Sequence, residues 1–313
     1  MRRGYVGAGH TVALMTGSLS GMYAALMTGL DADGAFAPDR QAALTDRVLG
    51  QGLAGLYVGG SSGESGLLDA PALLAQQEVV AEVARGRGAT LIAHVGMPAL
   101  ADSVLLARSA SKLGYDALSA LPPHSYPFSD AEILAYYREL AAATVLPLIV
   151  YEIPVRTGRP LPLDLLSDLL DLPNVAGIKF TSTDLFKLSM LRRRRPDRSY
   201  FYGFDEIFIG AAAFGVDGGI GTTYNIMGKL YVAMDQAIRA GDLGRARELQ
   251  DISQRFVELL LQTGVLPGMK AAFRVIGLDI GPTRAPMGLG AAPGAEDLLR
   301  PFLDSPEVRP WLA

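Results

Sequence analysis

Short apolar runs alternate with longer amphipathic segments along most of the chain. The short runs are almost continuously apolar, as strands buried on both faces must be. They predict strands at 22–27, 55–58, 90–95, 117–120, 146–151, 176–180, 200–202 and 218–221.

The segments between these runs carry apolar residues at helical spacing. They predict helices at 72–84, 103–113, 131–142, 163–170 and 185–194. Strands that alternate with helices in this way belong to the α/β class. The number of strand candidates favours a closed (β/α)8 barrel, the TIM barrel, over an open doubly wound sheet.

The strand pattern stops near residue 230, and helices are predicted at 231–240, 243–263 and 268–276. A turn-rich connector over 285–297 precedes a last short helix. We therefore expect three parts: a poorly ordered N-terminal leader over 1–20, the barrel over 21–230, and a C-terminal helical region over 231–313.

Composition narrows the functional classes. The chain has 313 residues and a formal net charge of −4, which gives no support to nucleic-acid or acidic-membrane binding. It has no cysteine, and its three histidines are scattered singly, so cysteine or histidine-cluster metal sites are not expected. No apolar run is long enough to span a membrane, and the N-terminal stretch has no clear signal-peptide cleavage site. We expect a cytoplasmic protein.

Lys179 is the most informative single residue. Of five lysines, it alone stands inside an apolar strand run, AGIKF. A buried ammonium is costly, so its pKa should fall, and a partly neutral lysine can attack a carbonyl to form a Schiff base. The alternative is a strand-end lysine whose amine extends into water.

Other polar groups follow the predicted strands, at the barrel face where chemistry is expected. The segment GGSSG at 59–63 is either an anion-binding nest or a flexible turn. Tyr151 is either a proton relay or a core residue at the barrel rim. Asp205 and Glu206 are either helix caps or acceptors for the hydroxyl groups of a sugar-like substrate.

Several longer motifs resemble one enzyme family, that of N-acetylneuraminate lyase and dihydrodipicolinate synthase, which are class I pyruvate-dependent aldolases. The resemblance runs from GMYAALMT near residue 21 into the C-terminal helices. The motifs that carry it are GLYVGGSSGE (55–64), LIAHVG (91–96), YEIPVRTG (151–158), GIKFTSTDLF (177–186), GFDEIF (203–208) and GGIGTTYNIMG (218–228). The fourth, fifth and sixth are similar to the neuraminate lyase branch.

This resemblance implies a role for each matching residue. Lys179 would form the Schiff base with pyruvate or substrate, and Tyr151 would relay the proton. Ser61 and Ser62 would hold the pyruvate carboxylate. The polyhydroxyl tail of the substrate would contact Thr181, Gly203, Asp205, Glu206 and Thr222. No metal or organic cofactor would be needed, because the protonated lysine imine is itself the electron sink. The family usually forms homotetramers.

Two departures from the family pattern bear on the substrate and the proton relay. Ser125 stands where the family has a tyrosine that reaches the neighbouring subunit's site, and Tyr126 follows one position later. Arg156 matches the synthase branch, in which an arginine faces a second substrate carboxylate.

The sequence thus predicts a lyase that cleaves or forms a carbon–carbon bond between pyruvate and an aldehyde. N-acetylneuraminate or a related sugar acid is the favoured substrate. The alternatives are dihydrodipicolinate synthase, which condenses pyruvate with aspartate semialdehyde, and another 2-keto-3-deoxy sugar acid aldolase or dehydratase. A keto-acid-binding barrel with an incomplete proton relay is the non-enzymatic alternative, and Ser125 is the residue that favours it.

Overall fold

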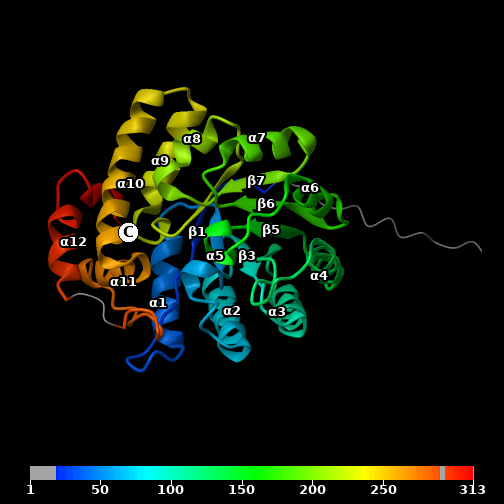
Figure 1. The fold of residues 1–313 in the computed structure, drawn as a ribbon. Coiled ribbons are helices and arrows are strands. Elements are labelled where there is room, and N and C mark those ends of the chain that lie inside the picture. Colours follow the sequence, from blue (N-terminus) through cyan, green and yellow to red (C-terminus); the bar gives the residue numbers. More distant parts are fainter. Residues whose placement is uncertain (1–18, 290–292, 313) are drawn as a thin grey trace, which may run out of the picture.

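Eight parallel strands close into a barrel at the centre of the computed structural model, which describes residues 19–289 and 293–312 (Figure 1). Each strand pairs with the next in sequence, and the last pairs with the first. This confirms the predicted TIM barrel. The strands are β1 (Gly21–Ala25), β2 (Gly55–Val58), β3 (Thr90–His94), β4 (Ala117–Ala120), β5 (Leu148–Glu152), β6 (Val175–Phe180), β7 (Ser199–Tyr202) and β8 (Gly218–Gly221).

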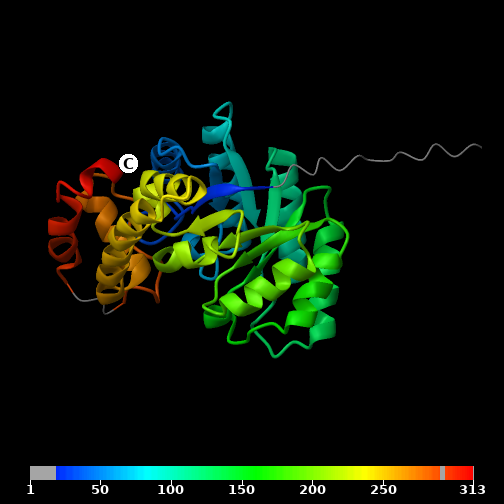
Figure 2. The same ribbon diagram turned by 90° about the horizontal axis from the view of Figure 1, so that it is seen from above.

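Helices surround the barrel, and a further group packs beside it. The surrounding helices are α1 (Pro38–Leu49), α2 (Ala70–Ala84), α3 (Leu100–Leu113), α4 (Asp130–Ala142), α5 (Pro154–Thr157), α6 (Leu163–Asp171), α7 (Leu185–Arg194), α8 (Phe208–Ala212) and α9 (Tyr224–Arg239). The C-terminal helices are α10 (Leu243–Thr263), α11 (Val265–Val275) and α12 (Ala295–Leu303). They gather on one side of the barrel, where α10 packs against α9 (Figure 2).

Alternation along each strand decides which side chains enter the barrel. On β6, Ile178 and Phe180 belong to the apolar layer between sheet and helices. The residue between them, Lys179, therefore faces the barrel interior. On β5, Tyr151 packs in the interior cluster together with Ile149. Period-two geometry thus brings a lysine and a tyrosine into the same enclosed space.

The start of α9 differs from the sequence prediction of 231. The helix begins at Tyr224, directly after β8, and Met227 interrupts its helical backbone with φ −118° and ψ 40°. Asn225 explains the early start, because its amide donates to the carbonyls of Ala25 and Thr222, both at 2.8 Å. A hydrogen bond from Asn225 to β1 depends on the tertiary structure, so the pattern of apolar residues gives no sign of it, and the early start of the helix is missed.

The predicted leader lies almost wholly in residues 1–18, outside the described residues. The division at residue 230 stays a prediction, although α9 runs across that position. Within the described ranges, no helix is both long and apolar enough to cross a membrane.

Candidate active site

Lys179 is enclosed by two tyrosine rings inside the barrel. Its Nζ lies 4.3 Å from the ring centre of Tyr57 and 4.2 Å from that of Tyr151. The lysine is 3% exposed, so the amine does not extend into solvent. Tyr151 on β5 is its register partner across the parallel sheet. The two residues that the sequence singled out for chemistry are therefore immediate neighbours.

Burial is the main influence on this amine, and it lowers the pKa of Lys179. The Tyr151 phenol and the Asp205 carboxyl act in the opposite direction, whereas the Arg156 guanidinium lowers the pKa of Lys179 further. A lowered pKa increases the fraction of neutral amine at a given pH, and the neutral amine is the nucleophile.

Tyr57 and His94 complete the surroundings of the lysine, and sequence reasoning missed both. The Tyr57 hydroxyl donates to Ser119 Oγ at 2.9 Å, and its ring meets that of Tyr151 edge to face. Strand alternation within GLYV could have identified it, because Leu56 and Val58 face the opposite layer. Tyr57 therefore has to point into the barrel.

His94 is held as a neutral ring. Its Nδ1 lies 3.0 Å from the Gly59 carbonyl oxygen, and its Nε2 accepts from the Leu121 N–H at 3.3 Å. Burial lowers the pKa of His94 to about 3, and the Lys179 charge contributes. A donor at Nδ1 and an acceptor at Nε2 fit one neutral tautomer. We therefore assign His94 to the support of the neighbouring loops.

Ser61 and Ser62 lie in a buried turn directly after β2, in the short 3₁₀ segment Ser61–Gly63. Ser62 Oγ is 2.6 Å from Thr222 Oγ1, which joins the loops after β2 and β8. Ser61 Oγ is buried and makes no hydrogen bond within the described residues. Buried hydroxyls are normally paired, so this one is a ready contact for a small polar ligand.

Thr181 and Gly203 approach each other closely at the ends of β6 and β7. A Cβ on residue 203 would lie 1.9 Å from Thr181 Oγ1, so only glycine fits there. Thr181 Oγ1 is the second buried hydroxyl without a partner in the described chain. Gly203 thus makes room for a hydroxyl that is available to a ligand.

Asp205 does not cap the helix that follows it, so that interpretation is wrong for this residue. Its Oδ2 accepts from the N–H and the Oγ1 of Thr223, at 2.8 and 2.7 Å. Its Oδ1 is buried and makes no hydrogen bond among the described residues. Burial raises the pKa of Asp205 to about 7, partly offset by the Thr223 hydrogen bonds. The adjacent Glu206 is only half-buried, and its carbonyl accepts from Gln254 at 2.9 Å.

Arg156 and Tyr126 stand farther out. Arg156 is exposed and lines a hollow of about 380 Å³ together with Glu64, Leu67, Pro286 and Met287. Tyr126 is 74% exposed and lines another hollow, of about 530 Å³, that also includes Ser125. The structure therefore does not bring these side chains into the enclosed space around Lys179.

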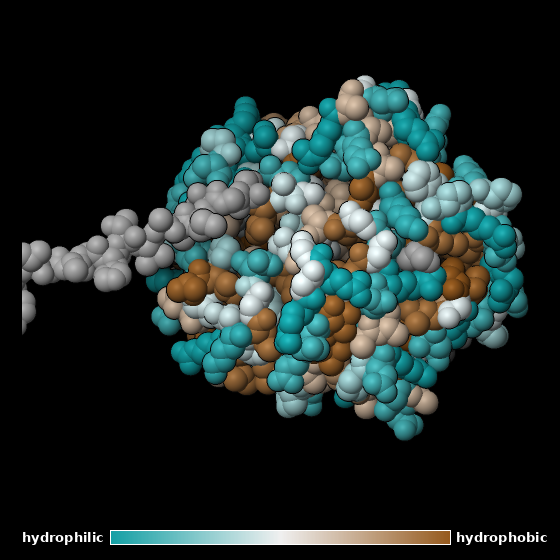
Figure 3. Space-filling view, turned by 180° about the vertical axis from the view of Figure 1, so that it is seen from behind, coloured by the Kyte–Doolittle hydropathy of each residue, from teal (hydrophilic) through white to brown (hydrophobic). Residues whose placement is uncertain are grey.

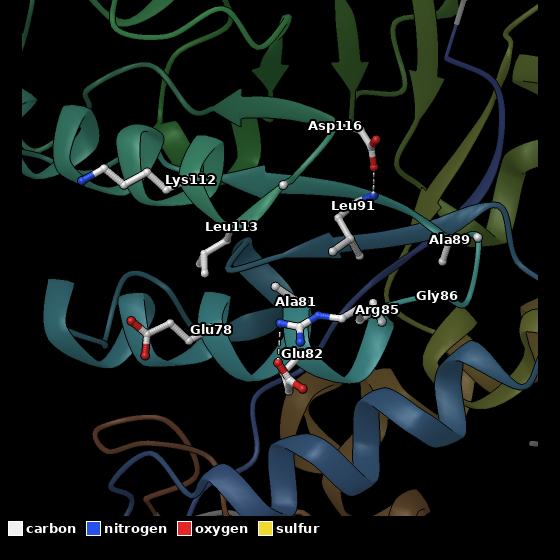
Figure 4. A pocket seen from close by; sticks show the side chains of 13 residues that line it. Glu78, Ala81, Glu82, Arg85, Gly86, Ala89, Leu91, Lys112, Leu113 and Asp116 are labelled. Carbon is white, nitrogen blue, oxygen red and sulfur yellow. Dashed lines mark hydrogen bonds and ion pairs between the residues drawn. The ribbon is translucent and has the colours of Figure 1, made fainter.

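A further hollow, of about 510 Å³, lies at the opposite end of the barrel (Figure 4). Leu91 at the start of β3 and Asp116 just before β4 line it, and the Asp116 carboxylate accepts from the Leu91 N–H at 2.8 Å. Its Arg85 and Glu82 pair with each other at 2.6 Å. The hollow lies at the barrel face that usually serves stability. Among residues 19–289 and 293–312, no three potential metal-ligating side chains of His, Cys, Asp or Glu come together.

Comparisons with known proteins agree on one family. The model of the dihydrodipicolinate synthetase family matches residues 18–296. An N-acetylneuraminate lyase of Rhizobium meliloti (strain 1021) is 46% identical over 271 residues, which is 86% of this chain and 89% of the relative.

Solved structures show the same relationship. CdNal from Clostridium difficile, solved in complex with mannosamine, has a TM-score of 0.88 at 29% identity and covers 94% of this chain and 100% of its own. A catalytic lysine mutant of the Ruminococcus gnavus sialic acid aldolase has a TM-score of 0.87 at 28% identity, with 94% and 98% covered.

Proposed function

Because the chain belongs to the dihydrodipicolinate synthetase family, we propose that it is a class I aldolase, a lyase that acts through an imine on Lys179. It cleaves or forms a carbon–carbon bond between pyruvate and an aldehyde. The observation that carries the proposal is the enclosure of Lys179 Nζ between the rings of Tyr57 and Tyr151. The related Ruminococcus gnavus sialic acid aldolase also has a catalytic lysine.

In the cleavage direction, the neutral Lys179 amine attacks the keto carbon of the substrate, and water leaves as the imine forms. A base removes the proton from the hydroxyl two carbons away, and the bond between the intervening carbon and the hydroxyl-bearing carbon breaks. Its electron pair moves to the protonated imine, which yields an enamine and releases the aldehyde. Protonation of the enamine and hydrolysis of the imine then release pyruvate.

Tyr151 is the residue best placed to move these protons. It is the register partner of Lys179, and its ring lies against the lysine amine. A phenol at that position can exchange a proton with a group bonded near the imine. No metal or organic cofactor is required in this scheme, because the imine accepts the electrons.

The carboxylate of the keto acid is assigned to the turn after β2. Ser61 offers a buried hydroxyl without another partner among the described residues, and Ser62 is fixed by Thr222. Small residues and backbone N–H groups in a tight turn suit a small anion.

For the aldehyde half, we favour a sugar acid such as N-acetylneuraminate. Thr181 Oγ1 and Asp205 Oδ1 are buried oxygens without partners in the described structure. Gly203 leaves room beside the Thr181 hydroxyl, and Gly221 leaves room beside Asp205 Oδ1. Glu206 follows Asp205 in the sequence. Thr222 precedes Thr223, which donates two hydrogen bonds to Asp205 Oδ2. The Rhizobium meliloti relative is an N-acetylneuraminate lyase, and CdNal was solved with mannosamine.

Arg156 supports the second candidate, a dihydrodipicolinate synthase. An arginine presents two parallel N–H groups to a carboxylate, which aspartate semialdehyde carries and the open chain of an amino sugar does not. Arg156 is exposed on the rim rather than enclosed with Lys179, which favours the sugar acid. A different 2-keto-3-deoxy sugar acid would use the same buried acceptors.

We also propose a homotetramer located in the cytoplasm. Apolar patches lie between polar ones on the rear face (Figure 3). Large apolar side chains that are strongly exposed in the single chain include Tyr126 at 74%, Val155 at 80% and Phe186 at 68%. Burial of such groups in a subunit interface is favourable. In such an assembly, Tyr126 would be the tyrosine that reaches the neighbouring subunit's site, in place of the residue at position 125.

The experiment that tests the function is a substrate panel. N-acetylneuraminate and several 2-keto-3-deoxy sugar acids are assayed for pyruvate release, and pyruvate with aspartate semialdehyde is assayed for condensation. We expect pyruvate release from N-acetylneuraminate or a related sugar acid. Condensation alone would establish the synthase. Imine formation with pyruvate but no turnover on any substrate would establish the keto-acid-binding barrel.

A further inference from the structure

The turn after β2 is tied to the C-terminal helices by a buried ion pair. Glu64 directly follows the segment Ser61–Gly63 and is 1% exposed. Lys270 on α11 is also 1% exposed, and its Nζ lies 3.5 Å from Glu64 Oε1. The same ammonium donates to the carbonyl oxygens of Thr28 and, at 3.3 Å, Ile280. A lysine on one of the C-terminal helices thus reaches the loop that follows β2.

The other oxygen of Glu64 and the backbone of the turn make hydrogen bonds of their own. Glu64 Oε2 accepts from the Arg284 N–H at 2.6 Å. Glu64 has φ 61°, a left-handed conformation that is unfavourable for a residue other than glycine. Thr28 Oγ1 donates to the Gly63 carbonyl at 2.6 Å and itself accepts from Gln76 at 2.9 Å. Contacts from the loop after β1, from α2 and from the C-terminal region therefore converge on one short turn.

Stability alone is a poor explanation for this pair. The desolvation of two buried charges offsets most of their attraction, and apolar residues of similar volume often serve the fold equally well. Burial indeed lowers the pKa of Lys270 to about 8, against the opposing effect of Glu64. What the pair does supply is a fixed position for the turn. The unpaired Ser61 hydroxyl and the bond between Ser62 and Thr222 both depend on that position.

We propose that Glu64 and Lys270 are positioning residues, which hold the turn at 60–64 in the geometry that binds the keto-acid carboxylate. This inference rests on the proposed function. Neither residue contacts the reacting atoms, so both act through the hydroxyls and N–H groups of the turn. The C-terminal helical region thereby becomes part of the pyruvate site.

The test measures how the fraction of protein trapped by borohydride as the imine rises with ligand concentration. The variants are Glu64→Gln and Glu64→Gln/Lys270→Met. The first variant keeps the side-chain shape, and the second leaves no unpaired buried charge. Each is titrated with pyruvate and with methyl pyruvate, which lacks the free carboxylate. We expect half-saturation with pyruvate to require roughly tenfold more ligand, because about one hydrogen bond to the carboxylate is lost. Half-saturation with methyl pyruvate and the maximal trapped fraction should stay nearly unchanged.

Glu296→Gln is the matched control, because it breaks an ion pair of the same helix, that between Arg274 on α11 and Glu296, at 2.5 Å. It should behave like the wild type with both ligands. Unchanged half-saturation in both Glu64 variants would overturn the positioning role, as would an equal rise for pyruvate and its ester. Absence of trapping in the wild type would remove the proposed function and, with it, this inference. A melting temperature restored in the double variant, without restored pyruvate affinity, would separate positioning from stability.

Discussion

Tyr151 and Lys179 face each other across β5 and β6, with the lysine Nζ 4.2 Å from the tyrosine ring centre. Their neighbourhood is set by the register of two paired strands, so it does not depend on the conformation of a loop. Both side chains are 3% exposed. An amine and a phenol held in this way can act on the same enclosed substrate, the amine by forming the imine and the phenol by transferring protons.

The first prediction concerns the Tyr151 hydroxyl. Tyr151→Phe keeps the ring against Lys179 but removes a proton-transfer group, which typically contributes about 10²–10⁴-fold to a rate. We expect turnover to fall by that order, while trapping of pyruvate by borohydride stays close to the wild-type level. Steady-state kinetics and trapping on the same preparations measure both. Wild-type turnover in this variant would make Tyr151 a packing residue only.

The second prediction distinguishes the two substrate branches through Glu206 and Arg156. For a sugar-acid lyase, Glu206→Gln should raise KM or lower kcat without changing pyruvate trapping, and Arg156→Ala should have a much smaller effect. In a synthase the order reverses, because a substrate carboxylate loses a charge-assisted contact worth about 1.5–3 kcal/mol.

The measurement compares both variants with a sugar acid and with aspartate semialdehyde. Severe loss in Arg156→Ala together with indifference to Glu206→Gln would contradict the sugar-acid assignment. It would leave the barrel and the role of Lys179 intact.

The third prediction follows from the pKa of His94, which burial lowers to about 3 from an ordinary value of 6.5. Below pH 6.5 the unfolded chain binds a proton that the folded chain does not. His94 therefore contributes stability that is complete above that pH and is lost as the pH falls toward 3. The expected slope approaches about 1.4 kcal/mol for each pH unit within this window.

His94→Gln removes this proton linkage. Urea unfolding between pH 7 and pH 4.5 should show a shallower loss of stability in the variant than in the wild type, even though the variant starts from a lower value. Parallel curves over this range would mean that His94 is not a buried neutral ring.

Much of the fold could be predicted from periodicity. The strands at 55–58, 117–120 and 218–221 and the helices at 185–194 and 243–263 have the predicted bounds. These segments are buried or amphipathic over their whole length, so the local pattern suffices. The start of α9 could not be predicted, because it depends on Asn225 reaching the carbonyl oxygen of Ala25.

Some residues of the site could likewise be identified from the sequence, and others could not. Lys179 and Tyr151 were identifiable because a polar group inside an apolar strand is conspicuous. Lys270 was not, since a lysine on an amphipathic helix usually extends into water. Only the packing of α11 against the turn after β2 shows that its amine is buried beside Glu64. The roles of the predicted site residues stay predictions until the variants are measured.

The most direct test is to map the lysine that borohydride labels in the presence of pyruvate. The chain has five lysines, so digestion and mass spectrometry can assign the label to a single peptide. We expect one reduced pyruvate adduct per chain, on the peptide that carries Lys179, and none in Lys179→Ala with its fold intact by circular dichroism. A label on another lysine, or no label at saturating pyruvate, would contradict the imine mechanism.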